Sequence, residues 1–396
     1  MHSGSRRREL GAFAGVFIAS LLAFVAVGAA LPVLPTYVRG PLHASNLDVG
    51  LVVGAFSLTS VFCRPIAGRL ADRRGRRVVL VAGALAMALG GLLYLLSDSV
   101  PTLIVGRLVV GMGEGSLYTA GAAWAVDLAP AERHGFALGL FGLGVWGGLS
   151  LGPVTGELLR SAAGYEAVWI LTAALPLAGA MIAAAVPARA RRAAPAAPAQ
   201  GGFALFPRAA RRPGASLALA NFGYAALAGF VVLDLRSRGV ADGASVFTAF
   251  AVAVFTSRIV LSRIPDRAGA RATATGAALV EALGLVMIAL ADSLASAIAG
   301  ALVVGVGFSM LFPALALMVV GEVDADRRGA ALGAFTAFFD VGVGLGGPVA
   351  GAIASLWGYP AVFVAGAAAA LAGAALAALP RAARIDTALH PARAQR

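Results

Sequence analysis

The sequence predicts an all-α membrane protein: twelve transmembrane helices arranged as two six-helix bundles, related by a pseudo-two-fold axis along the membrane normal. The 396 residues are 60% hydrophobic and 13% charged, whereas a water-soluble domain carries roughly 25% charged residues. Apolar runs of about 20 residues, the length at which a helix spans a ~30 Å hydrocarbon core, recur along the whole chain. The third observation behind this prediction is an internal repeat.

The second half of the chain repeats the first half after a shift of 194 residues. Residues 106–114 align with residues 300–308, and residues 164–165 align with residues 358–359. A repeat of long period indicates that one structural unit occurs twice. An even number of spans per unit gives both units the same orientation, so the repeat axis runs along the membrane normal.

The apolar runs place the helices. In chain order, we expect them over 11–36, 47–67, 78–97, 101–127, 135–158, 165–187, 214–235, 243–262, 272–291, 295–320, 329–354 and 359–380. The first run follows three arginines but is too long for a signal peptide, so we expect a retained helix. Residues 187–213 are rich in Pro, Ala and Arg and hold no apolar span. We therefore predict bundles over 1–187 and 214–396, joined by a linker over 188–213.

The basic residues predict the orientation in the membrane. The chain contains no lysine, so all 31 basic residues are arginine. If the spans alternate from a cytoplasmic N-terminus, 24 arginines lie in cytoplasmic segments, four in external segments and three within spans. Since positive charge concentrates on the cytoplasmic side, we expect both termini in the cytoplasm and the protein in the cell membrane. The net charge of +12 is then an orientation signal that meets lipid headgroups, and not a nucleic-acid surface.

Several kinds of chemistry are not expected. A single cysteine, Cys63, excludes a disulfide or a cysteine metal site within one chain. All four histidines fall in predicted loops or tails, so we expect no metal centre. We find no nucleophile–base pair and no Gly-x-x-x-x-Gly-Lys-Ser/Thr motif, so we expect neither an enzyme nor an ATP-driven pump.

The loop after the second predicted helix carries the most specific motif. Residues 68–77 read Gly-Arg-Leu-Ala-Asp-Arg-Arg-Gly-Arg-Arg, and a degenerate copy occupies residues 263–271. This pattern resembles the signature G-x-x-x-D-R-x-G-R-R of the major facilitator superfamily, and the resemblance extends over the whole chain. It implies a conformational latch that braces the two bundles, because an aspartate can cap a helix and pair with arginine. The predicted latch residues are Gly68, Asp72, Arg73, Gly75, Arg76, Arg77, Asp266 and Arg267. A loop that only sets orientation would explain the arginines but not the glycines and the aspartate.

A glycine motif follows in the fifth predicted helix. Glycines recur there at four-residue spacing and end in Gly-Pro, which resembles the antiporter motif of the same family, although Glu157 replaces its last glycine. Small residues on one face permit close helix packing, and proline permits bending. The motif residues are Gly144, Gly148, Gly152, Pro153 and Gly156, echoed by Gly347 and Pro348 in the eleventh predicted helix. The motif favours export over import, and packing alone is the alternative interpretation.

The fourth predicted helix carries an unusual polar face. Arg107, Glu114 and Tyr118 share that face, and Glu114 lies near the bilayer midplane. A charge at this depth is costly unless it faces protein or water. The repeat has Ala301 and Phe308 where the first copy has Arg107 and Glu114, so the scaffold does not require these charges. We therefore expect a role in substrate or proton binding, with structural pairing as the alternative.

A second midplane acid, Asp340, lies in the eleventh predicted helix. We expect it to contribute to coupling or substrate binding, with the aromatic side chains Phe338, Phe339 and Trp146 nearby. Glu281 is assigned a structural or lipid-interface role. Arg64 and Arg258 align with each other in the repeat, near the cytoplasmic ends of their helices. Duplication and easy snorkelling favour structural roles for both.

The first predicted helix lacks the acid that many drug:proton antiporters of the family carry, although its Pro-x-x-Pro-x-Tyr ending looks like the family's exporters. Proton coupling is therefore expected at Glu114 and Asp340. The resemblance implies a secondary transporter that exports a small drug-like or amphiphilic molecule in exchange for protons, works as a monomer and uses the proton gradient without a cofactor. Uptake of a sugar, organic acid or amino acid is the alternative, and a transporter-like sensor is a third interpretation.

Overall fold

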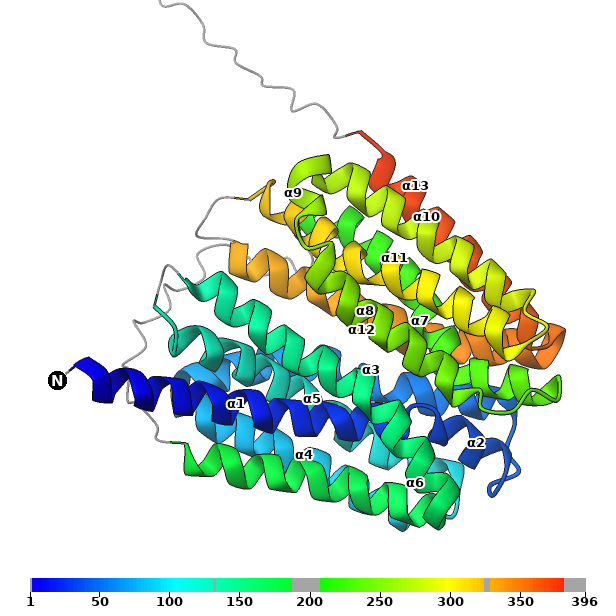
Figure 1. Ribbon diagram of the computed structural model, residues 1–396, viewed down its shortest axis with the longest axis horizontal. Helices are drawn as coiled ribbons and strands as arrows, with labels where there is room; N and C mark the ends of the chain where they lie inside the picture. The colour runs from blue at the N-terminus through cyan, green and yellow to red at the C-terminus, as the bar shows by residue number, and fades with distance from the viewer. Residues whose placement is uncertain (1, 131–132, 187–206, 324–327, 381–396) are drawn as a thin grey trace, which may run out of the picture.

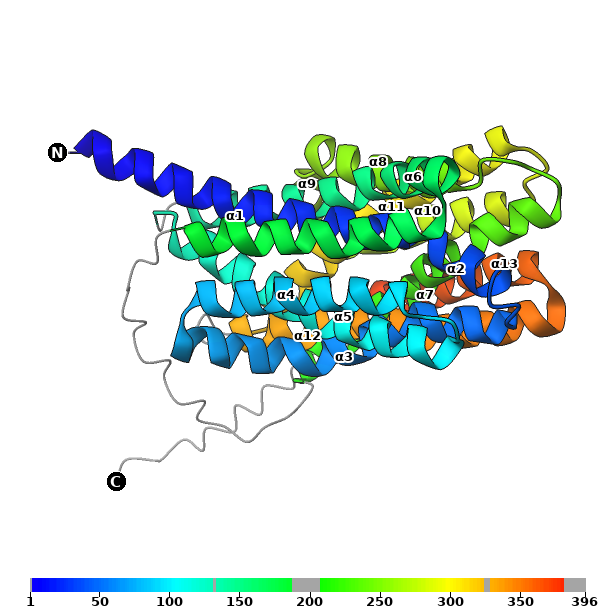
Figure 2. The same cartoon turned by 90° about the horizontal axis from the view of Figure 1, so that it is seen from below.

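The computed structural model describes residues 2–130, 133–186, 207–323 and 328–380, and the regular secondary structure within these ranges is helical, without strands. The helices are α1 (His2–Ala30), α2 (Val33–Arg39), α3 (Asn46–Arg74), α4 (Arg76–Leu95), α5 (Val100–Asp127), α6 (His134–Ala185), α7 (Arg208–Ser237), α8 (Ala244–Val260), α9 (Ile264–Ala268), α10 (Ala270–Ala289), α11 (Leu294–Val320), α12 (Arg328–Trp357) and α13 (Tyr359–Ala378). The long helices run roughly along one direction (Figures 1 and 2).

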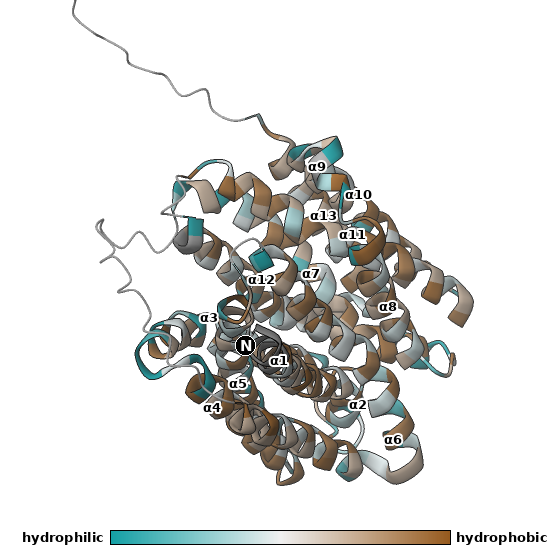
Figure 3. Cartoon of the chain, turned by 60° about the vertical axis from the view of Figure 1, so that its left-hand side comes forward, coloured by the Kyte–Doolittle hydropathy of each residue, from teal (hydrophilic) through white to brown (hydrophobic). Residues whose placement is uncertain are grey.

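The described residues contain the twelve predicted spans. Ten helical segments are long and apolar enough to cross a membrane, and α8 is a shorter apolar helix. One of the ten, α6, is 52 residues long and breaks at Gly164, so it provides two spans. Most residues of the helices are hydrophobic, and hydrophilic residues lie mainly near helix ends and connections (Figure 3). The fold class predicted from the sequence is therefore confirmed.

Several boundaries differ from the predicted ones. Helix α3 continues to Arg74, past its predicted end at 67, so most of the segment predicted as the loop after the second helix is helical. The first span is interrupted after Ala30 and continues as α2, where Pro32 and Pro35 limit the backbone. The predicted loop over 159–164 is helical up to a single residue, Gly164. Helix α7 begins at Arg208, within the segment predicted to be linker, while residues 187–206 of that segment lie outside the described ranges.

The repeat is visible in the backbone itself. Gly75 and Gly269 have φ values of 96° and 83° at the turns before α4 and α10. Gly164 and Gly358 both have φ 81° at the turns that open the last span of each half. Positive φ is cheap only for glycine, which explains why these four positions keep glycine in both copies. We call the end of the molecule with Gly75 and Gly269 the inner end, predicted to face the cytoplasm, and the opposite end the outer end.

The two halves pack closely toward the outer end, where α3 meets α12. A Cβ on Gly54 would lie 2.5 Å from the carbonyl oxygen of Gly344, so the two backbones touch. The hydroxyl of Tyr359 donates to Oδ1 of Asn46, 3.1 Å away. Nearer the inner end, Gly139 of α6 and Gly333 of α12 have no neighbouring atom within 4 Å of a Cβ position. The closest of these contacts between the halves therefore lie toward the outer end.

Substitution of Gly54 by alanine is expected to loosen the outer contact. Overpacking costs about 1–3 kcal/mol. Each 1.4 kcal/mol lowers the population of the arrangement with a closed outer end relative to an open one roughly tenfold. Val49 has an exposure of 0%, so a Val49→Cys probe in a Cys63→Ser background reports opening of the outer contact. We expect this cysteine to react faster with a membrane-impermeant maleimide when Gly54→Ala is added. The control Gly139→Ala, which meets open space, should leave the labelling rate unchanged, and equal rates in both variants would contradict the prediction.

Candidate functional site

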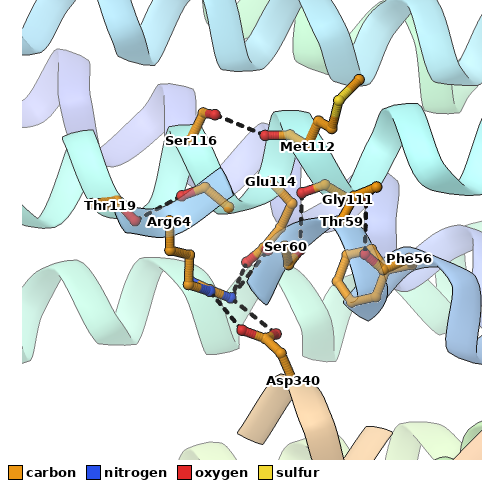
Figure 4. A network of polar contacts seen from close by, with 11 residues as sticks. Phe56, Thr59, Ser60, Arg64, Gly111, Met112, Glu114, Ser116, Thr119 and Asp340 are labelled. Carbon is orange, nitrogen blue, oxygen red and sulfur yellow. Dashed lines mark hydrogen bonds and ion pairs between the residues drawn. The ribbon is translucent and has the colours of Figure 1, made fainter. Parts of the chain in front are cut away.

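A buried ion-pair network lies at the centre of the molecule, between the halves. Arg64 of α3 donates from Nε to Oδ2 of Asp340 at 2.8 Å and from Nη2 to Oε2 of Glu114 at 3.1 Å (Figure 4). Nη2 also approaches Oδ1 of Asp340 at 3.4 Å. Glu114 belongs to α5 of the first half and Asp340 to α12 of the second, with exposures of 3% and 1%. One guanidinium thus holds two carboxylates from opposite halves.

The sequence builds the first-half side of the network through close approach of α3 and α5. A Cβ on Gly115 would lie 3.3 Å from Ser60, and one on Gly111 would overlap the carbonyl of Phe56. The Ser60 hydroxyl lies 2.8 Å from the Gly111 carbonyl oxygen and 3.2 Å from Oε2 of Glu114 (Figure 4). The hydroxyl of Thr59 donates to the carbonyl of Leu108 at 2.7 Å. These contacts fix the height of Glu114 relative to Arg64.

Tyr118 covers one side of the network. The Arg64 guanidinium carbon lies 4.9 Å from the centre of the Tyr118 ring. The ring packs edge-on against Phe24 of α1 and Phe141 of α6, with centroid distances of 6.3 and 5.7 Å. Of the candidates predicted from the sequence, Glu114, Asp340 and Tyr118 are therefore brought together.

Arg107 lies apart from the network, although it shares helix α5 with Glu114. Its Nε donates to the carbonyl of Val52 at 2.9 Å and its Nη2 to the carbonyl of Val53 at 3.3 Å. Its Nη1 lies 3.5 Å from the hydroxyl of Tyr94. The side chain is 1% exposed. Arg107 thus joins α5 to the backbone of α3 within the first half, and its role in substrate or proton binding stays a prediction.

An aromatic cluster adjoins the network on the side of α8. It comprises Trp146 of α6, Tyr224 of α7, Phe250 of α8, Phe308 of α11 and Phe339 of α12. Phe308 lies at its centre, 5.6 Å from Trp146, 5.5 Å from Tyr224 and 6.3 Å from Phe339 between ring centroids. The Arg258 guanidinium lies 4.6 Å from the Trp146 ring centre. Apolar surface from both halves therefore lies beside the charges.

Phe338 faces α7. A Cβ on Gly214 would overlap the ring of Phe338, so the ring packs on that glycine within the second half. Glu281 of α10 is separate from the network. It is completely buried at 0% exposure, and neither carboxylate oxygen has a hydrogen-bond partner among the described residues.

The predicted latch forms contacts within the first half. Arg76 pairs with Asp72 and reaches Asp127 at the end of α5, with its Nε 3.1 Å from Oδ2. Arg77 donates to the carbonyl of Val186 at 3.2 Å. Arg73 is exposed, and Gly68 meets only a methyl of Thr119, 3.7 Å from its Cβ position. In the second copy, Arg267 is exposed and the side chain of Asp266 lies outside the described set. The motif thus spans the end of α3 and the start of α4, and it ties α4 to α3, α5 and α6.

The glycine motif of α6 faces α1. A Cβ on Gly148 would lie 2.7 Å from the carbonyl of Leu21, and one on Gly152 would lie 2.5 Å from Cα of Gly28. Gly144 packs on Phe17, and Gly156 packs on Ala29. Pro153 follows Gly152 inside the helix. In the second half, Gly347 and Pro348 of α12 pack on α3 and therefore across the two halves.

The structure overturns the snorkelling interpretation of Arg64. This arginine is bound by both midplane acids and is 15% exposed in its side chain. The repeat contained the signal that would have identified it. Arg64 aligns with Arg258, and Asp340 aligns with Trp146, so each arginine meets the same position of the opposite half. Sequence comparison alone did not show that these positions meet.

A membrane-embedded bundle of two similar halves, with buried charges shared between them, defines a polytopic membrane transporter. The profile of the Major Facilitator Superfamily matches residues 16–241 and 216–395. The chain is 34% identical over 366 residues to an uncharacterised MFS-type transporter of Salmonella typhimurium, covering 90% of this chain and 93% of that protein. It is 32% identical over 374 residues to one of Pseudomonas aeruginosa, covering 91% of each. The chain belongs to the Major Facilitator Superfamily.

Solved structures show the same fold. The nucleoside transporter NupG has a TM-score of 0.76 at 14% identity, covering 92% of this chain and 97% of that one. The human organic anion transporter MFSD10 has a TM-score of 0.69 at 19% identity, covering 93% and 99%. The sequence identities are low, and the two transporters are named for different substrates. The similarity therefore concerns the fold alone.

Removal of the shared cation is expected to destabilise the protein. Arg64→Gln leaves two buried carboxylates without a counter-charge, and breaking such a pair costs about 3–5 kcal/mol. We expect a lower thermal transition in detergent for Arg64→Gln, and partial recovery in the double variant Arg64→Gln with Asp340→Asn, because the neutral amide needs no counter-charge. The matched substitution Arg73→Gln, on an exposed residue, should leave the transition within error of the wild type. Additive losses in the double variant would contradict the network.

Proposed function

We propose that this chain exports a small organic molecule across the cell membrane by alternating access, in exchange for protons. The observation that carries the proposal is the sharing of Arg64 between Glu114 and Asp340, which lie in opposite halves. A carboxylate in this position can take up a proton and thereby release the arginine. The charge state of the site is then linked to the contact between the halves.

Asp340 is the member that links protonation to movement. It is the only acid of the pair supplied by the second half, and it binds Arg64 across the interface at 2.8 Å. When Asp340 is protonated, Arg64 keeps its contact with Glu114 inside the first half and loses the charged contact across the interface. The halves can then separate without leaving an unpaired buried charge, which would cost several kcal/mol.

The packing of the halves supports alternating access. The backbones of α3 and α12 touch near the outer end, whereas glycines near the inner end of α6 and α12 meet open space. The observed arrangement is therefore closed at the outer end. Rocking about the central network would reverse this relation, as expected for two parallel repeats. We assign Asp72, Arg76 and Asp127 to bracing the first half as a rigid unit during this motion.

The direction of transport rests on sequence pattern. The Gly-Pro motif of α6 packs on α1 along its whole length, which suits a rigid helix pair that seals one side of the membrane. The energy available is sufficient for export. One proton crossing ~100 mV releases about 2.3 kcal/mol, and a pH difference of one unit adds about 1.4 kcal/mol. Together these two contributions can sustain a substrate concentration ratio of roughly a few hundredfold.

Proton-coupled uptake of an organic acid is the second candidate. The observation that favours it is Arg258, a cation near the inner end of α8 that has no acidic partner among the described residues. An anionic substrate would suit such a cation. For either direction we propose a monomer in the cell membrane, with both termini in the cytoplasm, that uses the proton gradient and no cofactor.

Loss of either network acid is expected to uncouple proton movement from substrate movement. In everted membrane vesicles loaded with a pH-sensitive dye, a substrate found by growth protection of a sensitised host should trigger proton release. We expect Asp340→Asn and Glu114→Gln to reduce this signal at least about tenfold, because neither amide can carry a proton.

Glu281→Gln provides the matched control, since Glu281 is an intramembrane acid without contact to the network. It should retain substrate-induced proton release. Normal release in Asp340→Asn would refute the coupling role of Asp340. Accumulation of labelled substrate inside intact expressing cells would refute export and favour the second candidate.

A further inference from the structure

The second half carries a partly buried cation that the proposed coupling network does not use. Arg258 lies near the inner end of α8. Its guanidinium lies 4.6 Å from the centre of the Trp146 ring. Its Nε is buried and has no hydrogen-bond partner, and no hydrogen bond or ion pair of Arg258 occurs within the described part of the chain.

The other two intramembrane arginines differ from Arg258 in this respect. Arg64 is bound by two carboxylates, and Arg107 donates to two backbone carbonyls and approaches a tyrosine hydroxyl. A buried donor without a partner is costly, and a charged one more so. A cation–π contact offsets part of this cost but leaves the N–H donors unused. Arg258 is therefore the cation whose hydrogen-bonding capacity remains open to another molecule.

The repeat shows how this difference arose in the sequence. Arg258 aligns with Arg64, Trp146 aligns with Asp340 and Phe308 aligns with Glu114. Each arginine thus faces two equivalent positions, one from each half. Arg64 meets the carboxylates of Glu114 and Asp340, whereas the positions equivalent to these around Arg258 carry the rings of Phe308 and Trp146. These two rings pack edge-on, with centroids 5.6 Å apart. The geometry that binds two acids at Arg64 therefore offers a cation beside an apolar surface at Arg258.

We propose that Arg258 and Trp146 bind the negatively charged group of an organic substrate, and that its aromatic or apolar body packs on Phe308, Phe339 and Tyr224. Carboxylate, sulfonate and phosphonate groups match a guanidinium because they accept two parallel N–H bonds. Arg64 adds a second donor, since its Nη1 is also buried without a partner. The inference rests on the central transport route proposed above, and its binding test does not depend on the direction of transport.

A lipid phosphate is a second source of the same chemistry, because Arg258 lies near a helix end from which a long side chain can reach a headgroup. The position of Trp146 favours the substrate. Trp146 packs on Phe308 and Phe308 on Tyr224, so the guanidinium is directed toward the aromatic cluster inside the protein. The test therefore includes a lipid arm.

The test uses the full-length protein in phosphatidylcholine nanodiscs and three probes of equal shape: 2-naphthoate, 2-naphthamide and 2-naphthylmethylamine. Binding is followed by quenching of tryptophan fluorescence, with Trp146→Phe to identify the responding residue. We expect naphthoate to bind at least about tenfold more tightly than the amide and the amine, as a charge-assisted bidentate contact implies. Arg258→Gln should remove this preference, and Arg258→Lys should retain part of it. The matched substitution Arg263→Gln, on an exposed arginine before α9, should bind as the wild type does.

Equal binding of the three probes, no binding of naphthoate, or unchanged naphthoate binding in Arg258→Gln would overturn the inference. Loss of naphthoate binding when phosphatidylglycerol replaces part of the phosphatidylcholine would assign Arg258 to lipid and would also overturn it. Binding at equilibrium requires no proton exchange. Failure of this test is therefore distinguishable from failure of the vesicle test for Asp340 and Glu114.

Discussion

The shared ion pair of Arg64 with Glu114 and Asp340 is the interaction on which the rest of the structure depends. Three charged groups are removed from water at the centre of a membrane protein, and each is tolerable only because the others are present. Because Asp340 comes from the second half, this requirement holds the halves together at the height of the network. The close glycine packing of α3 on α12 then closes the outer end on the same pair of helices. The ion pair and the glycine packing thus both act at the interface between α3 and α12.

The fold was predictable from the sequence because its causes are local or repeated. Apolar runs of spanning length give the helices, and the glycines at positive φ recur at the shift of 194 residues. The boundaries that were wrong, such as the loop before Gly164, depend on a single residue and not on composition. Periodicity shows where a hydrophobic span lies but not which of its last turns remain helical.

The site was predictable only in part, since it depends on contacts between distant helices. Helical periodicity placed Glu114 and Tyr118 on one face, and depth singled out Asp340. It could not show that α3 meets α12, so the partner Arg64 was missed. Arg107 shows the converse. Its acceptors are backbone carbonyls of Val52 and Val53, which no pattern of side chains reveals. An intramembrane charge is thus easily found in a sequence, whereas its partner can be identified only once the packing of the helices is known.

The charge of the substrate and the sign of proton coupling are not independent in this site. Arg64, Arg258, Glu114 and Asp340 carry formal charges that sum to zero when both acids are ionised. A cationic substrate and a proton each add positive charge, so they oppose one another's binding and are suited to exchange. An anionic substrate at Arg258 makes the site negative, and a proton on Asp340 or Glu114 restores neutrality, so the two favour one another and are suited to travel together. The membrane potential could still drive an anion out of the cell. A proton bound together with the anion would then have to leave against its own gradient, which opposes export. Recognition of an anion by Arg258 therefore shifts the weight from exchange toward uptake, and it does so through the same four side chains that make either process possible.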